Sequence, residues 1–170
     1  YMISVEKAKK FILKNTAALA PSVIDLVDSL GSVVASNVIS PIHLPLFNQS
    51  AMDGFAILFS DYINKNKIRV VGEVAAGKVY KSKVTSGQAV RIFTGAPIPA
   101  GVDTVVMQER ASVENGDLVI NNPSLQQAAN IRKAGSQIRK GQIALSKGTI
   151  ITPGGIGYLA AMGVTSINAS

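Results

Sequence analysis

The chain has 170 residues, enough for one ordinary domain or two small ones, because domains cluster at roughly 100 to 150 residues. Hydrophobic residues make up 47% of it, but no run approaches the about 20 apolar residues of a membrane span, so we expect a soluble protein without a membrane partner. Cysteine is absent, which excludes disulfides, thiolate metal sites and cysteine nucleophiles and fits a cytoplasmic location.

The net charge of +7 is unevenly distributed, since residues 118–170 contain no Asp or Glu. An excess of basic residues favours an anionic partner, either a phosphorylated small molecule or nucleic acid. A solvated, lysine-rich face explains the same charge without any partner. Charge therefore leaves these alternatives open.

The first predicted element is a helix over residues 4–15. Ser4 is a suitable N-cap, and apolar residues then recur at the spacing of one helix face: Val5, Ala8 and Ile12. The apolar patch at residues 11–13 is too short for a secretory signal, so we expect no export.

A second helix is predicted after the Ala20-Pro21 break. Asp25 is a possible cap, and four apolar residues follow that would share one helix face: Leu26, Leu30, Val33 and Val34. Gly31 lies inside this segment and costs a helix about 1 kcal/mol relative to alanine.

From Val38 the sequence changes to short β-rich runs that are separated by turn residues. The predicted strands are residues 55–58, 68–74, 89–93, 104–108 and 118–120. Asn115-Gly116-Asp117 is typical of a hairpin turn. We therefore predict an inserted, barrel-like β domain over residues 41–137.

The last part of the chain returns to a mixed pattern. Residues 142–145 and 149–151 are predicted as a hairpin around Lys147-Gly148, and Thr152-Pro153 as the start of a helix over 153–162 that ends before Gly163. We expect residues 1–40 and 138–170 to pack together as one discontinuous lobe of helices and a hairpin. The predicted fold class is α+β.

Asp53 is the first candidate for a chemical role, because it lies in the unusual turn-rich segment Asn48-Gln49-Ser50-Ala51-Met52-Asp53-Gly54. Gly54 would let the backbone bend sharply and direct the Asp53 carboxylate outward, with Ser50 as a possible hydrogen-bond partner. An isolated Asp-Gly pair more often only caps a turn.

The segment Arg91-Ile92-Phe93-Thr94-Gly95-Ala96-Pro97 gives a second candidate. It is predicted as a strand that ends in a stiff loop, where Thr94 and Gly95 would offer a hydroxyl and free backbone N–H groups to an anion. Taken alone, this segment favours a structural turn.

Two other functions were weighed against the sequence. Residues 155–160 fit a dinucleotide-binding glycine pattern, but no acidic residue follows Asp117 to bind a ribose, so we reject that site. A basic nucleic-acid-binding module would need aromatic residues among its cations, and only nine aromatics occur. That module and a pure dimerisation scaffold remain the alternative interpretations.

Five segments together resemble the molybdopterin molybdenumtransferase family, which includes the bacterial MoeA proteins and the E domain of gephyrin. They follow the family's order and approximate spacing over essentially the whole chain: N-Q-S-A-M-D-G-F-A at 48–56, G-E-V-A-A-G at 72–77, R-I-F-T-G-A-P-I-P-A-G at 91–101, V-V-M-Q-E at 105–109 and N-I-R-K-A-G at 130–135. The resemblance implies the first two domains of a four-domain enzyme.

The resemblance also implies an activity, which is the insertion of molybdate into adenylylated molybdopterin with a divalent cation such as Mg²⁺. It implies a homodimer whose site lies mainly on the third domain and is completed by second-domain residues of the other subunit. This chain alone would then be inactive without its C-terminal domains. Asp53 and Thr94 match the catalytic positions, with Asp53 as the metal ligand, and Ser50, Gly95 and Arg132 match substrate-binding positions.

One position departs from the family pattern. The family usually has a Gly-Glu-Asp stretch after N-x-R, whereas this chain has Gly135-Ser136-Gln137. Gln137 is uncharged and is a poorer ligand for a hard cation than a carboxylate. The departure implies either another ligand or an altered dependence on metal.

Overall fold

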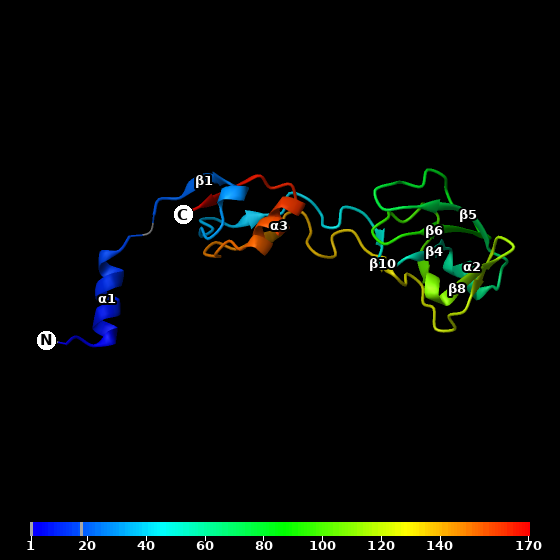
Figure 1. Ribbon diagram of the computed structural model, residues 1–170, viewed down its shortest axis with the longest axis horizontal. Coiled ribbons are helices and arrows are strands. Elements are labelled where there is room, and N and C mark those ends of the chain that lie inside the picture. The colour runs from blue at the N-terminus through cyan, green and yellow to red at the C-terminus, as the bar shows by residue number, and fades with distance from the viewer. Residues whose placement is uncertain (1, 18) are drawn as a thin grey trace. The chain divides into compact units, whose positions relative to one another are not determined.

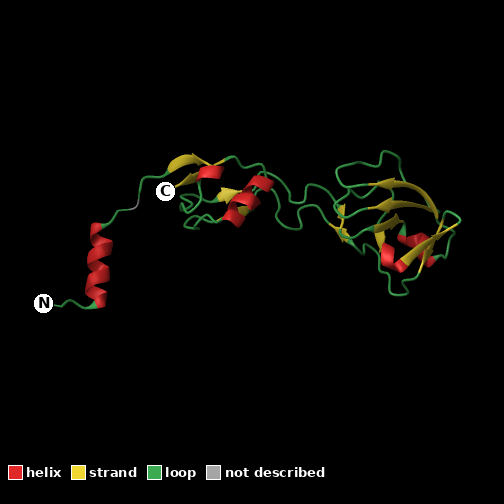
Figure 2. Cartoon of the chain, viewed as in Figure 1, coloured by secondary structure: helices red, strands yellow, loops and turns green. Residues whose placement is uncertain are grey.

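The computed structural model describes residues 2–17 and 19–170, and it confirms the α+β class (Figure 2). The chain divides into two compact units. Unit 1 combines Tyr1–Pro41 with Lys140–Ser170, and unit 2 is the continuous segment Ile42–Arg139. The chain ends are thus joined in one discontinuous unit, into which a β-rich unit is inserted.

Unit 1 begins with helix α1, Val5–Asn15, which confirms the first predicted helix (Figure 1). The Ser4 side chain accepts a hydrogen bond from the main-chain N–H of Lys7, so it caps the helix as expected. None of the residues of α1 is buried. No helix in the described part of the chain is long and apolar enough to cross a membrane.

The predicted helix after Asp25 is wrong. Strand β1, Ser22–Asp25, pairs antiparallel with β12, Ser166–Ala169, and only a short 3-10 turn, η1, Leu26–Asp28, follows it. Gly31 then has a φ of +81°, a left-handed conformation that ends any helix at that point. A distant strand partner therefore overrides the local helical spacing.

The predicted hairpin is also replaced by non-local pairings. Strand β11, Ile143–Leu145, pairs with β2, Val38–Ile39, and Ile150 forms a bridge with Val33. Helix α3, Pro153–Ala161, follows as predicted, with Thr152 accepting from the N–H of Gly155. The core of unit 1 consists of residues from both ends of the chain: Leu26, Val34, Ile151, Leu159, Met162, Ile167 and Ala169.

Unit 2 is built on a six-stranded sheet in the order β7-β4-β6-β5-β9-β8. The strands are β4 Gly54–Ile57, β5 Arg69–Val74, β6 Gln88–Ile92, β7 Thr104–Met107, β8 Ala111–Glu114 and β9 Asp117–Ile120. β5 and β6 are parallel and the other neighbours are antiparallel. All five predicted strands are present, and β8 adds a sixth.

Short elements complete unit 2. They are β3 Gln49–Ser50, which pairs with β10 Ile131–Arg132, helix α2 Phe59–Ile63, and the 3-10 turn η2 Gln108–Arg110. The β8–β9 hairpin turns at Asn115 and Gly116, which have φ values of 51° and 84°. Positive φ at both central residues defines the hairpin turn that the Asn-Gly pair predicted.

The apolar side chains of unit 2 form two clusters. One includes Phe55, Ile57, Ala89 and Val106, and the other includes Ala56, Val90, Ile92 and Val105. Adjacent residues of a strand point to opposite sides of a sheet, so the alternation along β4, β6 and β7 divides the two clusters between its faces.

Gly54 has a different function from the predicted sharp bend. It lies within β4, between β6 and β7, and its φ is not among the positive values. A Cβ atom at Gly54 would lie 1.9 Å from the carbonyl oxygen of Val106. Glycine is therefore required because the neighbouring strand passes too close for any side chain.

Candidate functional site

Asp53 and Thr94 come together on the surface of unit 2, just before β4 and just after β6. The main-chain N–H and the hydroxyl of Thr94 both donate to Asp53 Oδ1, each at 2.7 Å. Thr94 is exposed and Asp53 is partly exposed. Because β4 and β6 are antiparallel neighbours, the start of one strand and the end of the other meet at the same edge of the sheet.

The Thr94-Gly95 turn binds an anion, and that anion is the carboxylate of Asp53. The sequence predicted free N–H groups here, but the Thr94 N–H is bonded to Asp53 and the Gly95 N–H donates to the Ser50 carbonyl at 2.9 Å. Gly95 has a φ of +83°, which suits glycine and closes the turn. The prediction of unencumbered N–H groups is therefore wrong.

These contacts stabilise the charged form of Asp53. The hydrogen bonds from the N–H and then from the hydroxyl of Thr94 lower the pKa of Asp53, and the nearby Arg91 guanidinium lowers it further, while partial burial opposes them. The carboxylate is thus ionised at neutral pH. Its Oδ2 atom accepts no hydrogen bond from the residues that the structure describes.

Ser50 does not fit its predicted place in the site. Its side chain is completely buried, and its hydroxyl donates to the Met52 carbonyl at 2.5 Å rather than to Asp53. Its main-chain N–H donates to the Ala96 carbonyl at 2.9 Å. Ser50 therefore shapes the turn that precedes Asp53 and does not present its hydroxyl to a ligand.

Arg132 is exposed on β10, directly opposite Gln49 of β3. Gln49 also forms a bridge with Pro97, so one segment connects the Arg132 strand to the loop that follows Thr94. Gln137 is exposed, and its N–H donates to the Leu44 carbonyl at 2.9 Å. Arg132 is thus connected through β3 to the loop that follows Thr94. The hydrogen bond of Gln137 to Leu44 makes no such connection.

The residues around Asp53 suit only a partial metal site. The described part of the chain holds no group of three or more His, Cys, Asp or Glu side chains that could bind a metal ion. Mg²⁺ is commonly held by one or two carboxylates, with water and substrate phosphates as its other ligands. An ionised Asp53 with an open Oδ2 fits that mode of binding.

A groove of about 410 Å³ lies beside this pair, and we call it the Arg91 groove. Its lining residues are Phe55, Arg91, Gln108, Glu109, Ala111, Ser112 and Val113. The main-chain N–H of Gln108 donates to the Asp53 carbonyl at 3.0 Å, which ties the groove wall to the site. None of the lining side chains was predicted as functional, although Arg91 and Glu109 lie in two of the family segments.

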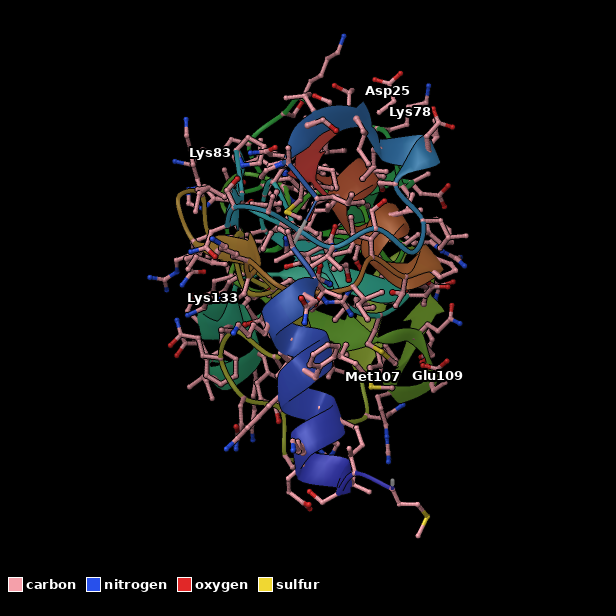
Figure 3. All side chains as sticks on the ribbon, turned by 90° about the vertical axis from the view of Figure 1, so that its left-hand side faces the viewer. Asp25, Lys78, Lys83, Met107, Glu109 and Lys133 are labelled. Atoms are coloured by element: carbon pink, nitrogen blue, oxygen red, sulfur yellow. The ribbon has the colours of Figure 1, made fainter. Side chains whose placement is uncertain are left out.

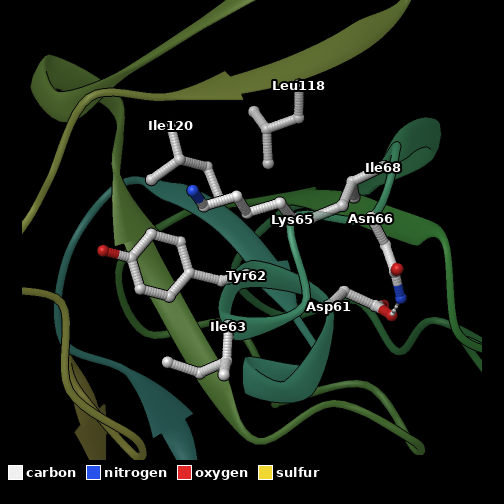
Figure 4. Close-up of a pocket in the computed structure, with 8 residues that line it drawn as sticks. All are labelled: Asp61, Tyr62, Ile63, Lys65, Asn66, Ile68, Leu118 and Ile120. Carbon is white, nitrogen blue, oxygen red and sulfur yellow. Dashed lines mark hydrogen bonds between the residues drawn. The ribbon is translucent and has the colours of Figure 1, made fainter.

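A second pocket, of about 400 Å³, lies beyond the other end of β4 (Figure 4). Its lining is mostly apolar, and the Lys65 side chain stretches across it toward Tyr62 and Ile120. Asp61 lines it too, but its carboxylate accepts bonds from Ser86, Asn66 and Gly87 and is completely buried. These bonds fasten α2 to the turn before β6.

The fold of this chain resembles that of a molybdopterin biosynthesis protein. It is similar to a crystal structure of the molybdopterin biosynthesis MoeA protein from Pyrococcus horikoshii OT3, with a TM-score of 0.90 and 30% sequence identity. The match covers 100% of this chain and 46% of that chain.

The sequence comparisons give the family. The chain matches the family model of the MoeA N-terminal region (domain I and II) over residues 3–163, and it belongs to that family. It is 31% identical to a molybdopterin molybdenumtransferase of Haemophilus influenzae, over 98% of this chain and 41% of the relative. A Staphylococcus epidermidis relative of the same name is 35% identical, over 99% and 41%. The chain thus spans about two-fifths of the length of these curated relatives.

Proposed function

We propose that this chain supplies the N-terminal domains of an enzyme that inserts molybdate into adenylylated molybdopterin. Family membership supports the general assignment, and the Asp53–Thr94 pair is the observation that carries the site. The further domains of the enzyme would supply most of the substrate-binding surface, in a cytoplasmic homodimer. The chain alone would not turn over substrate.

In this proposal Asp53 is a ligand of Mg²⁺ and Thr94 is the residue that holds Asp53 in place. Both Thr94 bonds fall on Oδ1, so Oδ2 would be the atom that binds a cation, and the lowered pKa favours the charged carboxylate. When bound, Mg²⁺ would polarise the phosphate oxygens of the adenylylated substrate. Thr94 would therefore act on the reaction mainly through Asp53.

The remaining assignments follow from exposure and charge. Arg132 is exposed and would contact a substrate phosphate. Gly95 contributes its left-handed turn, since its N–H is already bonded to Ser50. Ser50 is left out of the substrate contacts because its hydroxyl is buried and bonded.

The proposal is tested with a chimeric enzyme, in which this chain replaces the matching two-fifths of the Staphylococcus epidermidis relative. We expect molybdate insertion by the chimera, none by the chain alone, and a loss of at least about 100-fold with Asp53→Asn. Glu114→Gln, which neutralises an exposed carboxylate on β8, serves as the control and should retain activity. Full activity of a folded Asp53→Asn chimera would contradict the proposed role.

Direct cation binding gives a second measurement that needs no turnover. Mn²⁺, used as a paramagnetic probe of the Mg²⁺ site, should broaden the NMR signals of Asp53 and Thr94 in this chain. Asp53→Asn should remove that broadening, and Glu114→Gln should leave it unchanged. Unselective broadening of exposed carboxylates would count against a metal site at Asp53.

A further inference from the structure

The second pocket of unit 2 is not used by the proposed function. It lies beside α2, which follows the end of β4, whereas Asp53 precedes the start of that strand. Its volume of about 400 Å³ is in the range of small-molecule sites. We call it the Lys65 pocket, and its lining residues are Asp61, Tyr62, Ile63, Lys65, Asn66, Ile68, Leu118 and Ile120.

Part of the apolar lining of the Lys65 pocket is open to solvent. Ile68 and Leu118 are buried members of a core cluster, so they only close the pocket from within. Ile63 is 58% exposed, and Tyr62 and Ile120 are half-buried. The Tyr62 hydroxyl donates to a main-chain carbonyl at 2.9 Å, which holds the ring in place. A ligand therefore meets hydrocarbon surface on Tyr62, Ile63 and Ile120.

The ammonium group of Lys65 is the charge that a ligand in this pocket would reach. Figure 4 shows it beside Tyr62 and Ile120, with the Asp61 carboxylate turned the other way, toward Asn66. Asp61 is completely buried and already accepts three hydrogen bonds. Lys65 is exposed and forms no ion pair with any residue that the structure describes.

The neighbouring cations are paired with Asp117. Its two carboxylate oxygens lie 2.9 Å from Lys67 Nζ and 3.6 Å from Arg69 Nη1, and neither cation lines the pocket. A ligand in the pocket is therefore left with one unpaired ammonium group. One cation matches the single charge of a carboxylate better than the nearly double charge of a phosphate monoester.

Lys65 occupies a backbone position that glycine usually fills. It lies just after α2 and has a φ of 54°. Its N–H donates to the Tyr62 carbonyl at 3.2 Å, and the N–H of Asn66 donates to the Asp61 carbonyl at 2.9 Å. These two bonds define a Schellman helix end, where glycine is the favoured residue at the left-handed position. The lysine side chain can therefore be removed without disturbing the backbone.

We propose that the Lys65 pocket binds a small monocarboxylate that carries a hydrocarbon group, such as an arylacetate or a short fatty acid. The carboxylate accepts a hydrogen bond from the Lys65 ammonium group. The hydrocarbon group covers the exposed surface of Tyr62, Ile63 and Ile120. This is a second ligand site of unit 2, and it does not depend on the proposed reaction.

The proposal is tested by NMR titration of the 170-residue chain with phenylacetate, hexanoate, phenylacetamide and acetate. Phenylacetate, hexanoate or both should shift the signals of Tyr62, Lys65 and Ile120, with a dissociation constant of about 1 mM for so small a ligand. Phenylacetamide has the ring without the charge and acetate has the charge without a hydrocarbon group, so each should bind at least about tenfold more weakly. Comparison of phenylacetate with hexanoate decides whether the pocket prefers an aromatic or an aliphatic group.

Variants separate the charge of Lys65 from its effect on the fold. Lys65→Met keeps an apolar chain and should weaken the binding about three- to tenfold. Lys65→Gly should weaken it at least as much, while its free energy of unfolding in urea stays equal to or above that of the unchanged chain. Lys83 is exposed at the surface of unit 2 and does not line the pocket (Figure 3). Lys83→Met should therefore bind as the unchanged chain does.

Any of four results would overturn the inference. They are the absence of binding by both carboxylates, equal binding of phenylacetamide, shifts spread over the exposed lysines, and unchanged binding by Lys65→Met. A loss of stability in Lys65→Gly with unchanged binding would show instead that the lysine chain only covers apolar surface. The titrations contain no divalent cation, so their outcome is independent of the Asp53 experiments.

Discussion

Thr94 donates twice to the same oxygen of Asp53, through its N–H and through its hydroxyl, at 2.7 Å in both cases. The two residues are 41 positions apart in the chain, and antiparallel pairing of β4 and β6 brings them together. A carboxylate that is fixed by one atom keeps its second oxygen in a defined direction. The two bonds thus order the Asp53 side chain.

Removing only the hydroxyl should raise the pKa of Asp53 without returning it to its ordinary value of 3.8. Thr94→Val deletes the hydroxyl bond and retains the main-chain N–H bond, which is the larger of the two causes. Thr94→Ser keeps both bonds and is the matched control. NMR titration of the Asp53 carboxyl carbon measures the change, and identical titration curves for Val and Thr would contradict the geometry.

Gly54→Ala should destabilise unit 2 severely, by more than about 3 kcal/mol, because its Cβ would lie 1.9 Å from the Val106 carbonyl oxygen. Gly77→Ala is the comparison, since nothing lies within 4 Å of a Cβ there and only its φ of +75° opposes the change. That substitution should cost about 1 kcal/mol. Urea unfolding of both variants gives the two values, and similar losses would refute the close approach.

Asp61→Ala should lower the free energy of unfolding by about 3 kcal/mol. The buried carboxylate accepts bonds from Asn66, Ser86 and Gly87, and its removal leaves these donors without their acceptor inside the protein. Glu114→Gln changes an exposed carboxylate and should stay within about 0.5 kcal/mol of the unchanged protein. Equal stability of the two variants by denaturant unfolding would show that the network contributes little.

Acid should destabilise the protein partly through Asp61. Burial alone raises the pKa of Asp61, but the bonds from Ser86, Asn66 and Gly87 outweigh it, so the pKa lies below 3.8 in the folded state. A depressed folded pKa gives stability that is present above the unfolded value and is lost as the pH falls through the folded value. The free energy of unfolding should therefore decrease below about pH 4, and less steeply in Asp61→Asn.

Local patterns predicted the parts of the fold that depend on neighbouring residues. Ser4 and Thr152 cap their helices as expected, and Asn115-Gly116 forms the expected hairpin turn. The helix predicted after Asp25 fails because β1 pairs with a strand at the other end of the chain, and Leu30, on the supposed apolar face, is 59% exposed. Spacing along the chain contains no information about such a partner.

The sequence alone predicted only part of the candidate site. The local pattern indicated Asp53 and Thr94, the family resemblance implied their catalytic roles, and the structure brings them together. Spacing did not reveal that Asp53 occupies the donors of the Thr94 turn, that Ser50 is buried, or that Arg91 lies beside the pair. Each of these facts depends on which strands are neighbours, and sheet order is not a local property.

The pairing of β1 with β12 has a consequence for how the protein is made. Ser22 pairs with Ala169, so unit 1 can close only after Ala169 has left the ribosome. Every residue of unit 2 has been synthesised by then, because Ile42–Arg139 is one uninterrupted segment. Domains generally fold as units during synthesis. Unit 2 can therefore fold before β12 is available to pair with β1.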